Sequence, residues 1–312
     1  MTFIEQWLRS DIKNIDAYHV PVSKDMIKLD AMESPFGVPE DLKVEFLKCI
    51  EQSEVNRYPE ADPSPLKDTL RSLMDIPDEF GILLGNGSDE LIQLLALACS
   101  KDDLIMSFEP SFVMYELVSK YVNLEYFGVQ LDSNFDINLS DALLIIEREK
   151  PKIIFIAYPN NPTGNCFDYD AIIEIIKSTN SMVILDEAYY AYSDKSFLSE
   201  ISNFPNLLVL RTISKIGFAG LRLGLLIGDQ ETIAQLNKLR LPYNINALTQ
   251  TSANFLLQDK QRIINNAQII IEERRRLAHE LSLFSKFKVY PSQTNFILVH
   301  SEDAHSLHTA LK

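Results

Sequence analysis

The chain has 312 residues, with 29 Lys and Arg against 44 Asp and Glu and a formal net charge of −15. This acidic balance argues against nucleic-acid binding, which depends on clustered Lys and Arg. No apolar run approaches the roughly 20 residues needed to cross a bilayer, and the N-terminus shows no secretory leader. The three cysteines are widely spaced and form no C-x-x-C pair, which predicts reduced thiols in a cytoplasmic protein.

Residues 1–38 are predicted to form an N-terminal arm that belongs to a smaller domain. Its first helix, near residues 3–14, carries Trp7 on an apolar stripe that we expect to pack on the main domain or on a partner. Helical and strand patterns then alternate. Helical periodicity is found at residues 40–52, 65–75, 89–99 and 168–178, and short β-rich runs occur at residues 81–85, 104–108, 152–158, 182–187, 207–212 and 223–228.

The strand patterns are continuously apolar, which is typical of strands buried on both faces of a mainly parallel sheet. Because helices separate many of them, they predict βαβ units in a three-layer α/β/α large domain over residues 39–242. A small α+β domain is expected over residues 243–312. Its expected elements are two long helices near residues 246–257 and 260–284 and strands at residues 286–290 and 295–299.

Polar segments follow four of the predicted strands, at the sheet edge where open α/β sheets bind ligands. GNGSDE (85–90) joins a strand to a helix, so its glycines and the free N–H groups of the helix N-terminus suit a phosphate. It also fits an ordinary capped turn. YPNNPTG (158–164) is a rigid loop that points an amide side chain from a strand end, or is only a turn.

The other two segments carry an acid and a lysine. In DEAYY (186–190), Asp186 ends a very apolar strand, where a carboxylate is costly unless a cation pairs with it; it could equally cap the next element. RTISKIGFAGLRLG (211–224) places Lys215 among hydroxyls and glycines. A partly dehydrated lysine has a lowered pKa and is a competent nucleophile, although an exposed turn lysine fits the same pattern. Together the four segments supply the parts needed to hold pyridoxal phosphate.

These four segments resemble those of the fold-type I pyridoxal-phosphate aminotransferases. Four more segments resemble the histidinol-phosphate aminotransferases in particular: AYHVP (17–21), LDAMESPFG (29–37), NRYPE (56–60) and PSQTNFILV (291–299). The resemblance covers about residues 15–300. It implies the same fold, pyridoxal phosphate as cofactor, a homodimer, and transfer of the amino group of L-histidinol phosphate to 2-oxoglutarate in histidine biosynthesis.

The resemblance also implies roles for individual residues. Lys215 would bind the cofactor covalently and then move the substrate proton, and Asp186 would pair with the ring nitrogen. Asn161 and Tyr189 would hydrogen-bond the ring's phenolic oxygen, and Tyr115 would stack on the ring face. A buried Asp186 fits this role because an opposite charge keeps the ring nitrogen protonated, so that the ring can accept electrons.

The remaining implied residues hold the cofactor's phosphate or line the substrate pocket. The phosphate ligands would be Ser88, Asp89, Ser214 and Arg222, with Tyr58 from the neighbouring subunit. Tyr18 would line the substrate pocket together with Asn161 and Tyr58. No metal site is expected, because His300, His305 and His308 lie in a tail without clustered cysteines or a closing carboxylate pattern.

Two features depart from the family pattern. Arg222 follows Lys215 by seven residues, where many relatives have eight. The R-[IV]-[ST]-[IV]-G segment, whose arginine binds the substrate's anionic tail, is absent from the chain, so the small domain is expected to be incomplete. The residues leave open an aromatic amino-acid aminotransferase or a phosphothreonine decarboxylase of the same fold. From another class, they leave open a truncated, non-catalytic protein that binds pyridoxal phosphate.

Overall fold

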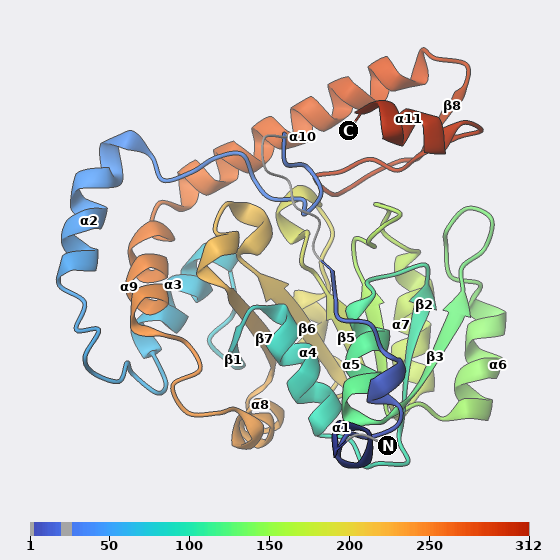
Figure 1. Cartoon of the computed structure of the whole chain (residues 1–312), viewed down its shortest axis with the longest axis horizontal. Coiled ribbons are helices and arrows are strands. Elements are labelled where there is room, and N and C mark those ends of the chain that lie inside the picture. Colours follow the sequence, from blue (N-terminus) through green and yellow to red (C-terminus); the bar gives the residue numbers. More distant parts are fainter. Residues whose placement is uncertain (1–2, 20–26, 312) are drawn as a thin grey trace.

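A seven-stranded sheet forms the centre of the computed structural model, which describes residues 3–19 and 27–311 (Figure 1). In spatial order its strands are β1 (Phe80–Asn86), β7 (Leu223–Asp229), β6 (Leu207–Thr212), β5 (Met182–Asp186), β4 (Ile153–Ala157), β2 (Leu104–Glu109) and β3 (Glu125–Gln130). Strand β7 runs antiparallel to both neighbours, and the other neighbouring pairs are parallel. The predicted mainly parallel sheet is confirmed.

Helices cover both faces of this sheet. One face packs against α3 (Ser64–Met74), α6 (Leu139–Glu149) and α7 (Tyr169–Ser178), and the other against α4 (Ser88–Leu97), α5 (Met114–Val122) and α8 (Gln230–Leu236). Side chains alternate between the two cores along a strand. In β4, Ile154 and Ile156 join the first core, whereas Ile153 and Phe155 join the second. The predicted three-layer arrangement is confirmed.

The segments after α8 lie beside and above this sheet. Helix α9 (Ala247–Leu256) packs against α2 (Lys43–Glu51) and α3, and the long helix α10 (Lys260–Ser282) crosses the top of Figure 1. Strands β8 (Phe287–Val289) and β9 (Val299–Ser301) then form an antiparallel pair, and α11 (Ala304–Leu311) follows. No helix within residues 3–19 and 27–311 is long and apolar enough to span a bilayer.

Several short 3-10 turns connect these elements. They are Ile12–Asn14, Glu40–Leu42, Tyr190–Tyr192, Leu198–Ser202, Ser214–Ile216, Ala219–Leu221 and Asn237–Leu239. The helix predicted at residues 40–52 therefore starts with a 3-10 turn. The strand predicted at residues 295–299 is wrong except for its last residue. The Phe296 carbonyl accepts hydrogen bonds from the hydroxyls of Ser292 (2.5 Å) and Thr294 (3.1 Å) instead of from a strand partner.

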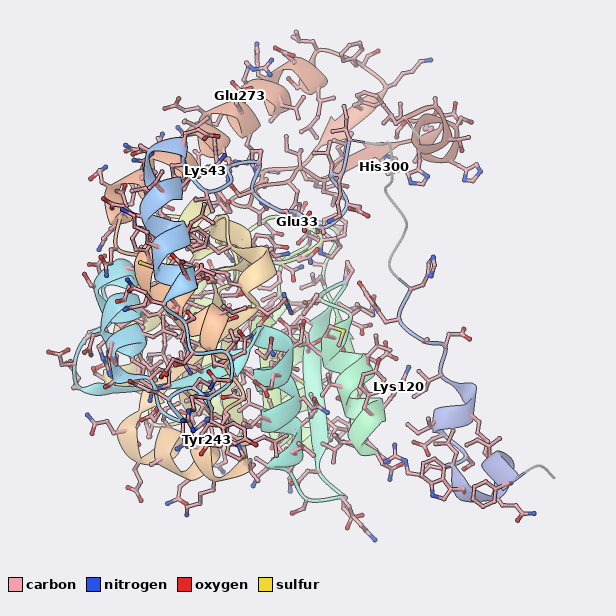
Figure 2. The ribbon with its side chains drawn as sticks, turned by 60° about the vertical axis from the view of Figure 1, so that its left-hand side comes forward. Glu33, Lys43, Lys120, Tyr243, Glu273 and His300 are labelled. Atoms are coloured by element: carbon pink, nitrogen blue, oxygen red, sulfur yellow. The ribbon has the colours of Figure 1, made fainter. Side chains whose placement is uncertain are left out.

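The N-terminal arm begins with a single short helix, α1 (Phe3–Trp7), and the predicted helix over residues 3–14 is broken. Arg9 donates hydrogen bonds to the carbonyls of Lys120 (3.1 Å) and Tyr121 (3.0 Å), near the end of α5, and so fastens the arm there. Trp7 is 70% exposed, and α1 stands apart from the body in Figure 2. Within the described chain, Trp7 therefore does not pack on the main domain; packing on a partner stays a prediction.

Candidate active site

A cavity of about 520 Å³ lies where β4, β5 and β6 end. Its walls come from the arm, the N-terminus of α4, residues 111–115 and the segments that follow these three strands. All the residues predicted to form the site except Tyr58 line this cavity: Tyr18, Ser88, Asp89, Tyr115, Asn161, Asp186, Tyr189, Ser214, Lys215 and Arg222. The four polar segments recognised in the sequence therefore meet in one place.

Strand alternation decides which carboxylate at the end of β5 enters the cavity. Ile184 faces the core beneath α4 and α5, so Asp186, two residues later, points to the same side. Glu187 lies one residue further on and points to the opposite side of the sheet, where it meets Arg211. Two adjacent acids thus have different tasks because they point to opposite faces of the sheet.

Asp186 is a buried carboxylate held by two neutral donors. The Tyr115 hydroxyl donates to its Oδ2 atom at 2.8 Å, and the Ala188 N–H donates to its Oδ1 atom at 3.1 Å. Burial raises the pKa of Asp186 to about 6, although both donors act in the opposite direction. No ion pair to Asp186 is formed within the described residues. A cationic ligand atom in the cavity would complete the charge balance of this carboxylate.

Lys215 lies across the same cavity on the turn that follows β6. Its Nζ atom donates to the Ala31 carbonyl at 2.9 Å and lies 5.7 Å from the centre of the Tyr189 ring. Burial lowers the pKa of the Lys215 ammonium, and the nearby carboxylates of Asp89, Glu33 and Asp186 oppose this effect. A lower pKa increases the share of the neutral amine, which is the form that acts as a nucleophile and a proton acceptor. Figure 2 shows Glu33 between α10 and the sheet.

The turn between β1 and α4 forms a close-fitting cradle. Gly87 has φ of 83°, and a Cβ atom there would lie 2.5 Å from Nη2 of Arg222. A Cβ atom on Gly224 would lie 2.5 Å from the Ser88 nitrogen. Arg222 also pairs with Asp89 at 3.2 Å. Free N–H groups, a helix N-terminus and an arginine make this corner suitable for a phosphate.

The loop after β4 uses its two asparagines differently. Asn160 is fully buried and fixes the loop, since its amide donates to the Pro110 carbonyl (3.0 Å) and to Thr163 Oγ1 (2.8 Å). Asn161 is only partly buried and lines the cavity. Tyr189 lines the same wall and packs edge-to-face on Phe296, with the ring centres 5.2 Å apart. The loop therefore presents one amide to a ligand while the other holds its shape.

An ion pair beneath the site ties two strand ends together. Nε and Nη2 of Arg211 donate to Glu187 Oε2 at 3.0 and 2.8 Å, and both side chains are almost inaccessible to water. Ser196 and the Phe197 N–H also donate to Glu187. Because Glu187 follows Asp186 and Arg211 precedes Lys215, this pair fixes the spacing of the segments that carry both.

Some positions differ from the sequence-based expectations. Tyr58 is exposed and stacks on Tyr243, with ring centres 4.5 Å apart, outside the cavity of its own chain. The Tyr115 ring is buried and its face is already stacked on Phe155, with ring centres 4.6 Å apart and nearly parallel. Phe112 also lines the cavity, and no such stacking partner covers it among the ring pairs of the described residues. The motif PSFVMY contained this signal, but a sequence does not tell which of its two aromatic rings faces a ligand.

These residues fit a ligand with a phosphate at one end, a cationic ring nitrogen at the other and a carbonyl carbon within reach of Lys215. Asp186 suits the nitrogen because a buried carboxylate needs a positive partner. The cradle at Gly87 suits the phosphate because a side chain there would clash with Arg222, the arginine that can bind the phosphate. These are the properties of pyridoxal phosphate, so the cofactor expected from the sequence fits the cavity.

Comparison with known proteins agrees with this geometry. The family model for aminotransferases of class I and II matches residues 24–311. The histidinol-phosphate aminotransferase of Vesicomyosocius okutanii is 56% identical over 312 residues, which are 100% of this chain and 88% of that protein.

Solved structures agree as well. The crystal structure of the Clostridium acetobutylicum histidinol-phosphate aminotransferase has a TM-score of 0.80 and 26% identity, covering 90% of this chain and 85% of that one. The Sinorhizobium meliloti enzyme, solved in complex with pyridoxal-5'-phosphate, shares the fold with a TM-score of 0.79 and 21% identity, over 90% of this chain and 77% of that one. The chain belongs to the class I and II aminotransferases and, among them, to the histidinol-phosphate aminotransferases.

Proposed function

We propose that this enzyme transfers the amino group of L-histidinol phosphate to 2-oxoglutarate, giving imidazole-acetol phosphate and glutamate, with pyridoxal phosphate as cofactor. The observation that supports this most strongly is the single cavity that holds Lys215, Asp186 and the N-terminus of α4. Its chain is 56% identical to a histidinol-phosphate aminotransferase. The reaction belongs to histidine biosynthesis.

The residues that hold the cofactor divide into three groups. Arg222, Ser214 and the backbone N–H groups of Ser88 and Asp89 bind the phosphate, supported by the cradle at Gly87. Asn161 and Tyr189 hydrogen-bond the phenolic oxygen, and Asp186 pairs with the ring nitrogen. Phe112, rather than Tyr115, covers the ring face, because Tyr115 is already stacked on Phe155.

The chemistry of the reaction depends on Lys215 and Asp186. Bound pyridoxal phosphate supplies a carbonyl carbon that an amine can attack and a ring that accepts an electron pair. Lys215 would hold the cofactor through its Nζ atom, and the same amine, once free, would act as the base that moves the α-proton of the substrate. Burial lowers the pKa of Lys215 and so favours the neutral amine that this step needs. Asp186 would keep the ring nitrogen positively charged.

The active form is proposed to be a homodimer in which each subunit completes its neighbour's site. Tyr58 is exposed and lies outside the cavity of its own chain, so it is free to reach the phosphate bound by a second copy. Tyr18 is 61% exposed at the mouth of the cavity and is proposed to line the substrate pocket with Asn161 and Tyr58.

Domain limits and location are also proposals. The arm (residues 1–38) and residues 243–312 form the small domain, and residues 39–242 form the domain that binds the cofactor; the sheet and its six covering helices within residues 39–242 support this division. The enzyme is placed in the cytoplasm because Cys49, Cys99 and Cys166 are all unpaired thiols.

A half-reaction panel tests the proposed substrate. Cofactor-loaded protein is mixed with L-histidinol phosphate, L-phenylalanine or L-phosphothreonine without a 2-oxo acid, and the visible absorbance is followed in a stopped-flow instrument. Histidinol phosphate should react at least about tenfold faster than phenylalanine, since a lost hydrogen bond to a charged group costs roughly 1.5–3 kcal/mol. Fastest reaction with phenylalanine would favour the aromatic aminotransferase, and carbon dioxide release from phosphothreonine would favour the decarboxylase. No reaction with any amine would favour a non-catalytic protein.

A further inference from the structure

Tyr115 contacts the carboxylate of Asp186 in a way that its predicted stacking role does not explain. The residue lies in the first turn of α5, and its side chain is completely buried. Its ring packs flat on Phe155 (4.6 Å, 4°) and edge-on against Phe112 (5.7 Å, 85°). These two contacts fix the direction in which the ring points, and its hydroxyl donates to Asp186 Oδ2 at 2.8 Å.

The two hydrogen bonds to Asp186 fix the plane of its carboxylate. Oδ1 is held by the Ala188 N–H and Oδ2 by Tyr115. The Ala188 donor belongs to the chain segment next to Asp186, whereas the Tyr115 donor comes from another helix. Removing the phenol would leave the carboxylate held on one side only, free to rotate about its χ2 bond.

We propose that Tyr115 is a positioning residue, which orients the Asp186 carboxylate toward the ring nitrogen of the cofactor and keeps it ionised. The inference rests on the proposed function, because it assigns Tyr115 a task toward the same cofactor. A phenol suits the task since it is neutral: it donates a hydrogen bond without cancelling the negative charge that the ring nitrogen needs. A lysine in its place would itself neutralise Asp186.

Substitution of Tyr115 by Phe tests the proposal, because it removes the hydroxyl and keeps the ring. The matched control is Tyr126→Phe. The Tyr126 hydroxyl hydrogen-bonds Ser107 (2.6 Å) and Glu109 (2.9 Å) but does not line the cavity. The ligand is pyridoxine 5'-phosphate, which lacks the aldehyde and so reports on binding without Lys215 chemistry. Its affinity for the cofactor-free proteins is measured by equilibrium dialysis from pH 5 to pH 8.

Tyr115→Phe should bind pyridoxine 5'-phosphate about tenfold more weakly at pH 7, as expected for a lost hydrogen bond to a charged group. The acid limb of its binding profile should move up by about one pH unit, because the ionised form of Asp186 loses a donor. The affinity of Tyr126→Phe should stay within about twofold of the wild-type affinity, and the acid limb of its binding profile should not move. The ligand's own titration is common to all three proteins and cancels in the comparison.

Equal affinity of Tyr115→Phe and wild type would overturn the proposal. So would a uniform loss of affinity with an unmoved acid limb, since that is the mark of a merely structural residue. If Tyr115→Phe does not fold, 3-fluorotyrosine at position 115, a stronger donor of nearly the same shape, should move the acid limb down; an unmoved limb would overturn the proposal. Wild-type protein that binds neither pyridoxine nor pyridoxal phosphate would overturn the proposed function itself.

Discussion

The ion pair between Glu187 and Arg211 should contribute far more to stability than an ion pair on the surface. In Arg211→Met, the Glu187 carboxylate stays inaccessible to water and loses both guanidinium hydrogen bonds. Breaking a buried pair costs about 3–5 kcal/mol. Ser196 and the Phe197 N–H still donate to the carboxylate, so we expect the free energy of unfolding to fall by about 3 kcal/mol, near the lower end of that range. This is a large share of the roughly 5–15 kcal/mol that stabilises a typical protein.

Urea unfolding of the cofactor-free protein, followed by circular dichroism at one fixed protein concentration, measures this loss. The control is Arg276→Met, which removes an exposed arginine that pairs with Glu273 and Glu280 on α10 and should cost no more than about 1 kcal/mol. A variant that replaces both Glu187 and Arg211 by Met should lose less than the sum of the single losses. Equal losses in Arg211→Met and Arg276→Met would refute the reasoning.

Three further variants test the candidate site. Lys215→Ala should lose essentially all turnover while still binding the cofactor, because no second lysine among residues 3–19 and 27–311 lines the cavity; transamination at the wild-type rate would contradict its assignment. Asp186→Asn should raise the activation free energy of substrate deprotonation by several kcal/mol, which half-reaction kinetics would show as a slower rate. In the cofactor-free protein the same change should stabilise the fold at pH 7. The pKa of Asp186 is raised to about 6 from an ordinary 3.8. Between these pH values the native state therefore binds more protons than the unfolded state. The free energy of unfolding of the wild type should fall as pH rises through this window, by up to about 3 kcal/mol. The urea midpoints of the two proteins should therefore converge below about pH 4 and separate above pH 6, and a constant difference would contradict the burial argument. Tyr58→Phe should weaken cofactor affinity by about one to two powers of ten, and mixing it with Lys215→Ala should recover part of the activity, because one site of each mixed dimer carries both lesions and the other carries none. No recovery at limiting cofactor would contradict the shared site.

The sequence predicts the central strands well because they are continuously apolar. The edge strand β3 was missed, since it is mostly half-buried and reads as a mixed segment between helices. Helices α5 and α6 on either side of it were missed with it. Strand β7 was expected, but not its direction: the ten residues between β6 and β7 (213–222) form only 3-10 turns, too short for the crossover that a parallel neighbour requires.

The residues of the candidate site also divide into those that the sequence predicts and those that it does not. Residues that directly follow strands, such as Asp186 and Lys215, could be predicted because strand ends meet at one edge of a parallel sheet. The position of Tyr115 could not, since it depends on which face of α5 packs against Phe155. The hydrogen bond from Lys215 to the Ala31 carbonyl could not be predicted either, because a backbone acceptor in a distant segment leaves no pattern in the sequence.

The order of the two acids at the end of β5 constrains how the gene for this enzyme can change. Inserting or deleting one codon within β5 would exchange the faces of Asp186 and Glu187. Glutamate would then enter the cavity and aspartate would meet Arg211, each with a side chain of the wrong length. Length changes along this lineage should therefore accumulate in the loops between helices and strands and be excluded from this strand. Swapping the two residues would preserve charge and composition and still remove the function of both.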